Sequence, residues 1–312
     1  MWKIIGGLFM GWSLGGNDAA NVFGPGVAAR VLKYSTAVTL IAIFVILGAS
    51  LEGPKCMHII KEVGKLTPIT ALVATLAAGA TITLMTILAI PSSTSQAIMG
   101  AIMGVCLLYG QPNWGALGKA ATCWVLTPIG AAMVAFILMK ILIPTTRKYL
   151  KTDRAINRFA LGGLLMAGCY GSYSLGANNV ANVTGVYVSA GMLTSRPAAI
   201  IGGIAIAVGA LTFSKRVMKA VGHDITMIGP LGAFVAELSE AITVHIFTQV
   251  GVPVSTSQAI VGAIIGIGLV RGIAAVSRKK VIQIFVGWIS TPLTAAAITY
   301  ATCRYILPLF GV

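Results

Sequence analysis

Charged residues are scarce in this sequence, and their scarcity excludes a soluble globular protein. Lys, Arg, Asp and Glu make up 9% of the 312 residues, whereas hydrophobic residues make up 57% and the mean hydropathy is +0.93. No charged residue occurs in five stretches, 34–51, 66–118, 159–195, 197–214 and 281–303. Each stretch has at least the roughly 17 residues that a bilayer-spanning helix needs. A porin-like barrel would instead show short segments of alternating hydrophobicity. We therefore predict an all-α polytopic membrane protein.

The sequence also lacks the residue patterns of enzymes and of resident metal centres. The five cysteines form no CxxC pair and show no metal-ligand spacing, so we interpret them as small core residues. No paired acid and base, metal triad or nucleophile–base arrangement stands out. The sequence therefore predicts neither an enzyme nor an organic cofactor.

The formal net charge of +15 does not indicate a nucleic-acid partner, because the basic residues lie in the gaps between the apolar stretches. This placement follows the positive-inside rule of membrane proteins, so the expected partner is the lipid bilayer. The first apolar stretch resembles a signal peptide, but Asn17 and Asp18 lie in its middle and no clear cleavage site follows. We expect it to be retained.

The chain is an internal duplication. Residues 12–22 read WSLGGNDAANV, and residues 173–183 read YSLGANNVANV. Two further landmarks recur in the same order at an offset of about 161 to 164 residues. They are PSSTSQAIMG and PVSTSQAIVG, which begin at Pro91 and Pro253, and WVLTP and WISTP, which begin at Trp124 and Trp288. We expect a first repeat over 1–143, a basic linker over 144–158 and a second repeat over 159–312.

Each repeat is expected to cross the membrane five times. The predicted segments of the first repeat are 2–31, 35–51, 67–90, 92–109 and 114–143, and those of the second are 159–193, 197–213, 225–250, 253–270 and 281–307. The first segment is expected to break near Gly15–Gly16 and the fifth at Thr127–Pro128, and residues 52–65 are expected to form a loop. An odd number of crossings places the two repeats in opposite orientations, as in many secondary transporters.

The distribution of basic residues orients the chain. With both termini outside, fifteen basic residues lie on the inner side and six on the outer side. Arg30, Lys33, Lys215, Arg216 and Lys219 are among the inner ones, together with the linker. We expect a multi-pass protein of the cell membrane with both termini extracytoplasmic and a cytoplasmic linker.

The GGND motif places a carboxylate inside an apolar segment, where such a group normally faces a partner, a cavity or an ion. The neighbouring glycines would let the helix unwind and free backbone carbonyls. These carbonyls, the Asp18 carboxylate and the amide oxygens of Asn17 and Asn21 are hard ligands that suit Na⁺, and Asp18 could instead carry a proton. The alternative is that the asparagines only hydrogen-bond between helices. Two copies of the motif favour the ion site.

The STSQ motifs begin two helices, because proline ends the preceding segment and hydroxyl side chains cap the new one. The first amides of a helix lack intrahelical partners and form an anion site with the helix dipole. In an inverted repeat the two helix starts come from opposite sides and can converge near the midplane. They would offer Ser93, Thr94, Ser95, Gln96, Ser255, Thr256, Ser257 and Gln258. The alternative is an ordinary N-cap at the membrane edge.

Two acidic residues of the second repeat have no acidic counterpart in the first. Glu237 and Glu240 lie three residues apart, on one helix face. We choose Glu237 as a further cation ligand, and the alternative is that both line a wet crevice. His58 and His223 are expected in loops, and His245 is interpreted as structural rather than as a proton relay.

Three kinds of segment carry a resemblance to a known family: GGNDAANVFGPGV, GANNVANVTG and the paired STSQ segments. With these segments in order, essentially the whole chain resembles the inorganic phosphate transporter (PiT) family. The resemblance implies inverted repeats with discontinuous helices around a midplane site, and a Na⁺- or H⁺-coupled phosphate symporter that could form a homodimer. Asn179 stands where the family usually has Asp, and Gln96 and Gln258 stand where many members have His. Fewer titratable groups favour Na⁺. Because the family also includes sulfate permeases, the motif alone does not decide the anion.

The sequence thus predicts import of inorganic phosphate by symport with Na⁺. The expected phosphate ligands are the eight residues of the STSQ motifs with Asn17 and Asn178, and the expected Na⁺ ligands are Asp18, Asn17, Asn21, Asn178, Asn182 and Glu237. An inside-negative potential opposes anion entry by about 2.3 kcal/mol per charge and 100 mV. HPO₄²⁻ would need three Na⁺, and H₂PO₄⁻ two, before the potential assists uptake. The alternatives are an H⁺-coupled phosphate or sulfate permease and an anion channel.

Overall fold

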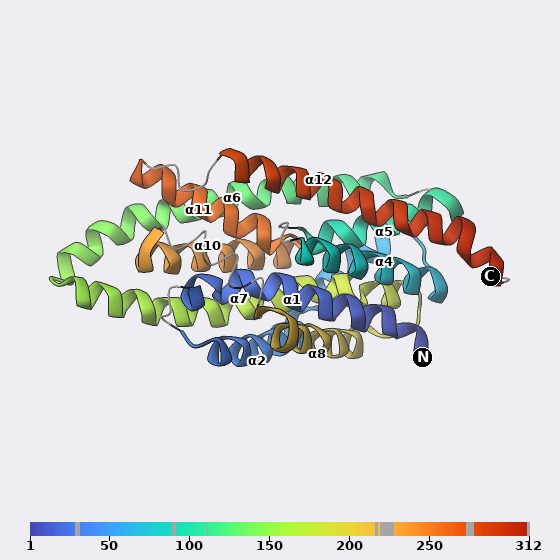
Figure 1. Cartoon of the computed structure of the whole chain (residues 1–312), viewed down its shortest axis with the longest axis horizontal. Coiled ribbons are helices and arrows are strands. Elements are labelled where there is room, and N and C mark those ends of the chain that lie inside the picture. Colours follow the sequence, from blue (N-terminus) through green and yellow to red (C-terminus); the bar gives the residue numbers. More distant parts are fainter. Residues whose placement is uncertain are drawn as a thin grey trace.

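The computed structural model describes residues 1–28, 32–88, 92–110, 112–215, 218, 228–272 and 278–310. Regular secondary structure in these ranges is helical throughout (Figure 1), which confirms the predicted all-α class. Pro91, which was expected to end a segment, lies outside the described residues, as do Arg30, Arg216, Lys219 and His223.

The two repeats contain corresponding helices. In the first repeat these are α1 (Ile5–Ala28), α2 (Tyr34–Glu52), α3 (Pro54–Val63), α4 (Pro68–Ile87), α5 (Thr94–Tyr109) and α6 (Trp114–Tyr149). In the second they are α7 (Asp153–Ser189), α8 (Ser195–Phe213), α10 (Gly229–Val250), α11 (Thr256–Arg271) and α12 (Arg278–Ala301). Within the described ranges α2, α4, α6, α8 and α10 are long and apolar enough to cross a membrane.

Two of the expected helix breaks are wrong. α1 continues through Gly15–Gly16 without a break. These glycines instead allow α8 to pack closely, since a Cβ on Gly15 would overlap the carbonyl oxygen of Ile206. α6 continues through Pro128, next to which the Thr127 hydroxyl donates to the carbonyl of Cys123 at 2.7 Å. The glycines of the GGND motif therefore serve helix packing and do not free backbone carbonyls in this structure.

The expected loop 52–65 is also wrong, because α3 occupies most of it. The pattern is amphipathic: Cys56, Met57, Ile59, Ile60 and Val63 are buried, and the charged residues alternate with them. Pro54 starts the helix at its first turn. α3 continues beyond α2 along the C-terminal part of α7.

The connection between the repeats is shorter than the expected linker. α6 extends to Tyr149 through Pro144, and α7 begins at Asp153, so only 150–152 separate them.

Each repeat contains a helical hairpin, α4–α5 in the first repeat and α10–α11 in the second. In Figure 1, α4 and α5 lie together in the right-hand part of the molecule, and α10 and α11 lie together in the left-hand part. α4 and α10 are long and apolar enough to cross a membrane, so five crossings per repeat stays a prediction.

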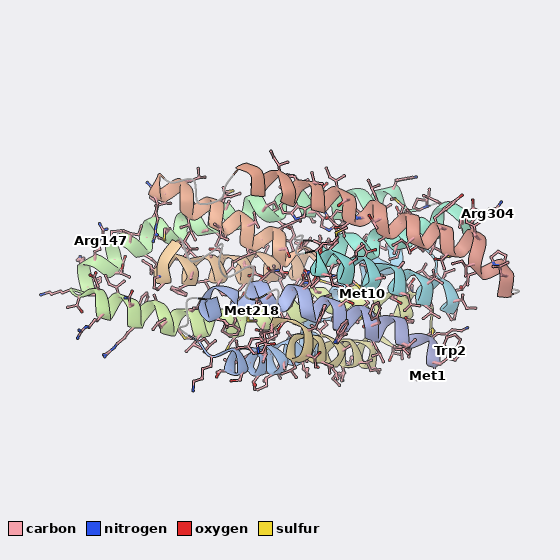
Figure 2. The ribbon with its side chains drawn as sticks, viewed as in Figure 1. Met1, Trp2, Met10, Arg147, Met218 and Arg304 are labelled. Atoms are coloured by element: carbon pink, nitrogen blue, oxygen red, sulfur yellow. The ribbon has the colours of Figure 1, made fainter. Side chains whose placement is uncertain are left out.

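The predicted inversion of the repeats is confirmed. Both termini lie at one end, and the α6–α7 connection lies at the other (Figure 1). In Figure 2, Met1, Trp2 and Arg304 mark the first end and Arg147 the second.

The repeats interlock through reciprocal close contacts. A Cβ on any of four glycines would overlap a backbone carbonyl of a helix in the other repeat: Gly15 with Ile206, Gly176 with Val45, Gly100 with Pro292 and Gly262 with Pro128. Each contact has a counterpart at the repeat offset. The duplication seen in the sequence is therefore also a pseudo-two-fold symmetry of the packing.

Gly176→Ala is expected to destabilise the protein by about 1–3 kcal/mol, because the new methyl group overfills the α2–α7 contact. Gly162→Ala is the matched control on the same helix, since nothing lies within 4 Å of its Cβ position. Removing an open helical glycine should stabilise the protein by about 0.5–1 kcal/mol. Thermal unfolding in detergent measures both, and equal shifts in the two variants would contradict the interlocking contact.

Candidate functional site

The tips of the two hairpins meet in the middle of the protein. Ser93 and Ser255 cap α5 and α11, and each hydroxyl accepts the backbone N–H of the residue three positions later at 3.3 Å. The Ser95 hydroxyl donates to the carbonyl of Val254 at 3.0 Å, which joins one tip to the other. The structure thus brings the two STSQ motifs together, as the inverted repeat suggested.

The two helix starts carry the features of an anion site. The first backbone N–H groups of α5 and α11 have no acceptor within their own helix, and the helix dipole makes this end positive. The hydroxyls of Thr94, Ser95, Thr256 and Ser257 lie in the same turns and are at most 4% exposed. A small oxyanion between the tips could therefore accept hydrogen bonds from both repeats without a charged ligand.

Asparagines from α1 and α7 connect to the opposite tip. The Asn21 amide donates to the Ser257 hydroxyl at 2.9 Å, and the Asn182 amide donates to the Ser95 hydroxyl at 2.9 Å. These two bonds are related by the repeat. They place an amide oxygen beside each serine of the tips.

Asn17 and Asn178 hold the hairpins. The Asn17 amide donates to the hydroxyl of Thr86 at 2.6 Å, and Asn178 donates to its counterpart Thr248 at 3.1 Å. The Asn178 oxygen also accepts the backbone N–H of Val254 at 2.7 Å. The side chains of both predicted ligands are thus already engaged with the hairpins in this structure.

The symmetry fails at the one carboxylate of the GGND motif. The Thr94 hydroxyl donates to Asp18 at 2.7 Å. In the second repeat Asn179 occupies the equivalent position, and its oxygen accepts from Asn182 at 2.8 Å and from Ser95 at 3.2 Å. Of this pair of equivalent positions, only the one on α1 therefore carries a carboxyl group.

Two further carboxylates lie on α10. Glu237 is 0% and Glu240 is 2% exposed. Within the described ranges, neither oxygen of Glu237 has a hydrogen-bond partner, and its carboxylate lies against Gly171 of α7. Glu240 lies one helical turn from Glu237 on α10, and its Oε2 also has no partner in the described ranges. Buried carboxylates without partners are costly unless a cation or a proton compensates them.

The site offers both hydrogen-bond acceptors and hydrogen-bond donors as possible ligand atoms. Buried groups without a partner in the described part of the chain include three oxygen acceptors and two donors: Gln96 Oε1, Gln258 Oε1, Asn182 Oδ1, Thr256 Oγ1 and Asn179 Nδ2. No group of three His, Cys, Asp or Glu residues in those ranges is arranged to hold a metal. A cation would thus depend on hydroxyl, amide and carboxylate oxygens. Every predicted site residue is at most 7% exposed, so the site is occluded.

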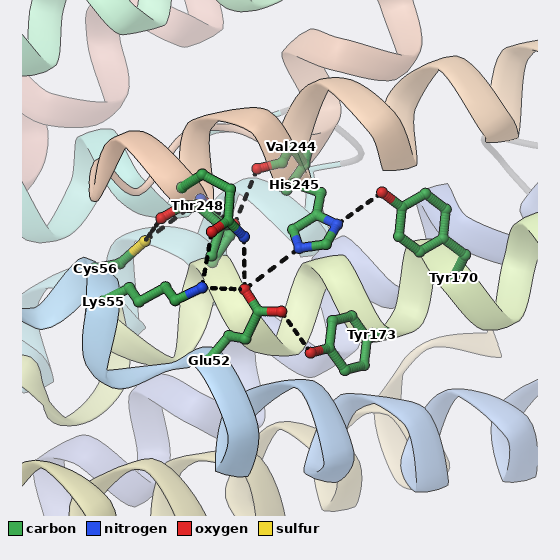
Figure 3. Close-up of polar contacts among 10 residues, drawn as sticks. Glu52, Lys55, Cys56, Tyr170, Tyr173, Val244, His245 and Thr248 are labelled. Carbon is green, nitrogen blue, oxygen red and sulfur yellow. Dashed lines mark hydrogen bonds and ion pairs between the residues drawn. The ribbon is translucent and has the colours of Figure 1, made fainter.

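Two sets of contacts near the tips have no recognisable pattern in the sequence. The Trp124 indole donates to the carbonyl of Pro253 at 3.3 Å and thereby supports the second tip. Glu52 connects to Tyr173, His245 and Gln249, which lie 121 to 197 residues away in the chain (Figure 3). Such distances leave no local pattern to detect, and position 52 lay in an expected loop.

Comparisons with known proteins agree with this architecture. The model of the phosphate transporter family matches twice, over residues 14–159 and 144–299. A Methanocaldococcus jannaschii protein named "Putative phosphate permease MJ0630" is 31% identical over 304 residues, 97% of either chain. The sulfate permease CysP of Bacillus subtilis is 29% identical and covers 95% of this chain and 85% of its own. A solved structure titled "The sodium-dependent phosphate transporter" superposes with a TM-score of 0.88 at 25% identity, over 98% of both chains.

Asn178→Ala is expected to lower the free energy of unfolding by about 2 kcal/mol or more, because it leaves buried groups of the second hairpin without partners. Asn157→Ala, at an exposed position of the same helix, is the matched control and should have little effect. Thermal unfolding in detergent compares them. Equal stability of the two variants would show that Asn178 does not hold the hairpin.

Proposed function

The chain belongs to the phosphate transporter family, and we propose that it imports inorganic phosphate by symport with Na⁺. The observation that carries this proposal is the meeting of two helix starts beside one buried carboxylate, in an occluded site formed by both repeats. An anion and a cation can neutralise each other there. The names of the relatives, which are permeases, support transport and not enzymatic turnover.

Phosphate would bind to the two tips. Its oxygens would accept hydrogen bonds from the first N–H groups of α5 and α11 and from the hydroxyls of both STSQ motifs. The proposed ligands are Ser93, Ser95, Gln96, Ser255, Thr256, Ser257 and Gln258. Thr94 would contribute its backbone N–H, because its hydroxyl already donates to Asp18. Asn17 and Asn178 would act on phosphate through the hairpins that they hold. This division explains how neutral groups alone could bind an anion.

Sodium would bind beside the phosphate, with Asp18 as the charged ligand. Asn21 and Asn182 supply amide oxygens at the tips, and Asn17 and Asn178 lie one turn away. Glu237 would supply the ligand of a more distant site on α10. The name of the solved relative, a sodium-dependent transporter, supports the choice of cation.

Charge balance favours two to three Na⁺ per phosphate. Each charge moved across 100 mV is worth about 2.3 kcal/mol, so an inside-negative potential assists the uptake of HPO₄²⁻ only with three Na⁺ and of H₂PO₄⁻ only with two. The charge balance applies to the orientation that the basic residues favour, with the α6–α7 connection in the cytoplasm.

Sulfate is the competing substrate, because the relative CysP is named a sulfate permease and covers nearly the whole chain. Sulfate and phosphate have the same shape and would use the same donors. Asn179, Gln96 and Gln258 are not titratable, which leaves Asp18, Glu237 and Glu240 as the groups that an H⁺-coupled mechanism could use. The name of the solved relative supports Na⁺ over H⁺, and the phosphate transporter family model supports phosphate over sulfate. We therefore favour Na⁺ and phosphate.

Proteoliposomes containing the protein should take up radiolabelled phosphate when Na⁺ is outside and not when choline replaces it. Asp18→Asn should reduce the initial rate about 100-fold, since the loss of a buried charge partner is worth about 3 kcal/mol. Asp153→Asn removes an exposed carboxylate at the start of α7 and serves as the control. Uptake driven only by a pH gradient, or accumulation of sulfate instead, would contradict the proposal.

Two threonines at equivalent positions should have different effects. Thr94→Val removes the hydrogen bond to Asp18, so it should raise the Na⁺ concentration for half-maximal uptake about fivefold, as expected for about 1 kcal/mol. Thr256→Val should instead raise the KM for phosphate, because its hydroxyl is free to bind the anion in the described structure. Each constant is measured with the other ion saturating. A shift of the same constant in both variants would refute the separate roles.

A further inference from the structure

A network of polar side chains lies next to the site and has no part in the ligand sets above. We define the Glu52 cluster as Glu52, Lys55, Tyr173, His245 and Gln249 (Figure 3). Glu52 Oε2 accepts from Lys55 at 2.8 Å and from Gln249 at 2.6 Å, and lies 3.3 Å from His245 Nε2. Glu52 Oε1 accepts from the Tyr173 hydroxyl at 2.8 Å. One carboxylate therefore joins α2, α3, α7 and α10.

The cluster holds the last turn of α10, directly before the second tip. His245 and Gln249 flank Thr248, whose hydroxyl binds Asn178. Cys56, next to Lys55, lies in the same contact: its sulfur is 3.6 Å from the Asn178 amide and 4.0 Å from the carbonyl of Thr248. Cys56 is fully buried there. Displacing α10 from α3 would break these contacts and expose the sulfur.

Apolar side chains occupy most of the equivalent positions in the other half. At the repeat offset, Phe213 stands for Glu52, Trp12 for Tyr173, and Ile87 for Gln249. The rings of Trp12 and Phe213 stack at 4.4 Å between centroids. The fold can therefore pack this position with aromatic rings. Lys55 corresponds to Arg216, which lies outside the described residues. A network centred on a carboxylate, where the described part of the other repeat stacks aromatic rings, indicates a purpose beyond packing, because partly buried charges cost free energy unless they are paired.

The Glu52 cluster and the Trp12–Phe213 stack also differ in how their contacts break when the helices move apart. An aromatic stack is not directional and loses contact gradually, whereas in the cluster four donors share one carboxylate, so that movement of the Glu52 carboxylate breaks all four bonds at once. Such an arrangement has a closed and an open state with little between them. It is partly accessible, because the side chains of Glu52, His245 and Lys55 are 19%, 24% and 45% exposed.

We propose that the Glu52 cluster is a latch that keeps the tip of the α10–α11 hairpin closed over the binding site, with Glu52 as its central positioning residue. Release of the latch moves the last turn of α10 away from α3 and opens the site on this side. The inference concerns the opening of the site, and it rests on the proposed function only in that transport requires such an opening.

The accessibility of Cys56 tests the latch without any substrate. In a chain whose other four cysteines are alanine, Cys56 is alkylated with N-ethylmaleimide in Na⁺-free, phosphate-free buffer. Glu52→Gln should increase the alkylation rate about tenfold. Tyr173→Phe, which removes one of the four donors, should increase it by a smaller factor and provides a milder variant if Glu52→Gln does not fold.

Glu62→Gln is the matched control. Glu62 lies on α3, the helix of Cys56, and within the described residues it pairs with His58 on the surface, at 3.1 Å. It should leave the alkylation rate of Cys56 unchanged. An equal increase in Glu62→Gln and Glu52→Gln would overturn the latch, because the effect would then be one of general charge loss on this segment.

Uptake kinetics separate a latch from a structural support. A weaker latch favours the open site, so Glu52→Gln should raise the KM for phosphate several-fold while the maximal rate changes less. A lower maximal rate with unchanged KM and unchanged Cys56 alkylation would overturn the proposal. If the transported anion is not phosphate, uptake fails in the parent chain as well, but the Cys56 result with Glu52→Gln still decides the latch.

Discussion

The contact between the two hairpin tips is the feature on which the rest of the structure depends. Polar groups at membrane depth have no water to bind and must find partners inside the protein. Here Ser95 bonds to Val254, and Asn21 and Asn182 each bond to the tip of the other half. Each tip therefore depends in part on groups of the other half. The duplication, the glycine contacts and the occlusion of the site follow from this mutual dependence.

The two halves differ at the residues to which we assign the cation site and the latch. Asp18 has Asn179 as its counterpart, so the site holds a single carboxylate at the tips. Glu237 corresponds to Thr75, whose hydroxyl contacts that of Tyr187 at 2.8 Å. The Glu52 cluster corresponds to stacked aromatic rings. In the proposed mechanism, symmetric positions bind the anion, and asymmetric positions supply the charge for the cation and the latch for the hairpin.

The sequence was sufficient for the features that recur in it. The duplication, the helical class and the caps at Ser93 and Ser255 all follow from repeated motifs with a local physical cause. The break at Gly15–Gly16 was wrong because a glycine permits both unwinding and close packing, and only the neighbouring helix decides. Five crossings per repeat stays a prediction, because α4 and α10 are long enough to span. The Glu52 cluster could not be predicted, since its partners are distant in the chain.

The number of phosphate ions bound per chain tests the central claim most directly, because that claim is that both tips form one site. Equilibrium dialysis of the purified protein with radiolabelled phosphate and saturating Na⁺ measures it. The account predicts one phosphate per chain, and predicts that Ser95→Ala and Ser257→Ala each weaken that single site. Two phosphates per chain, with each variant losing one and leaving the other unchanged, would contradict it.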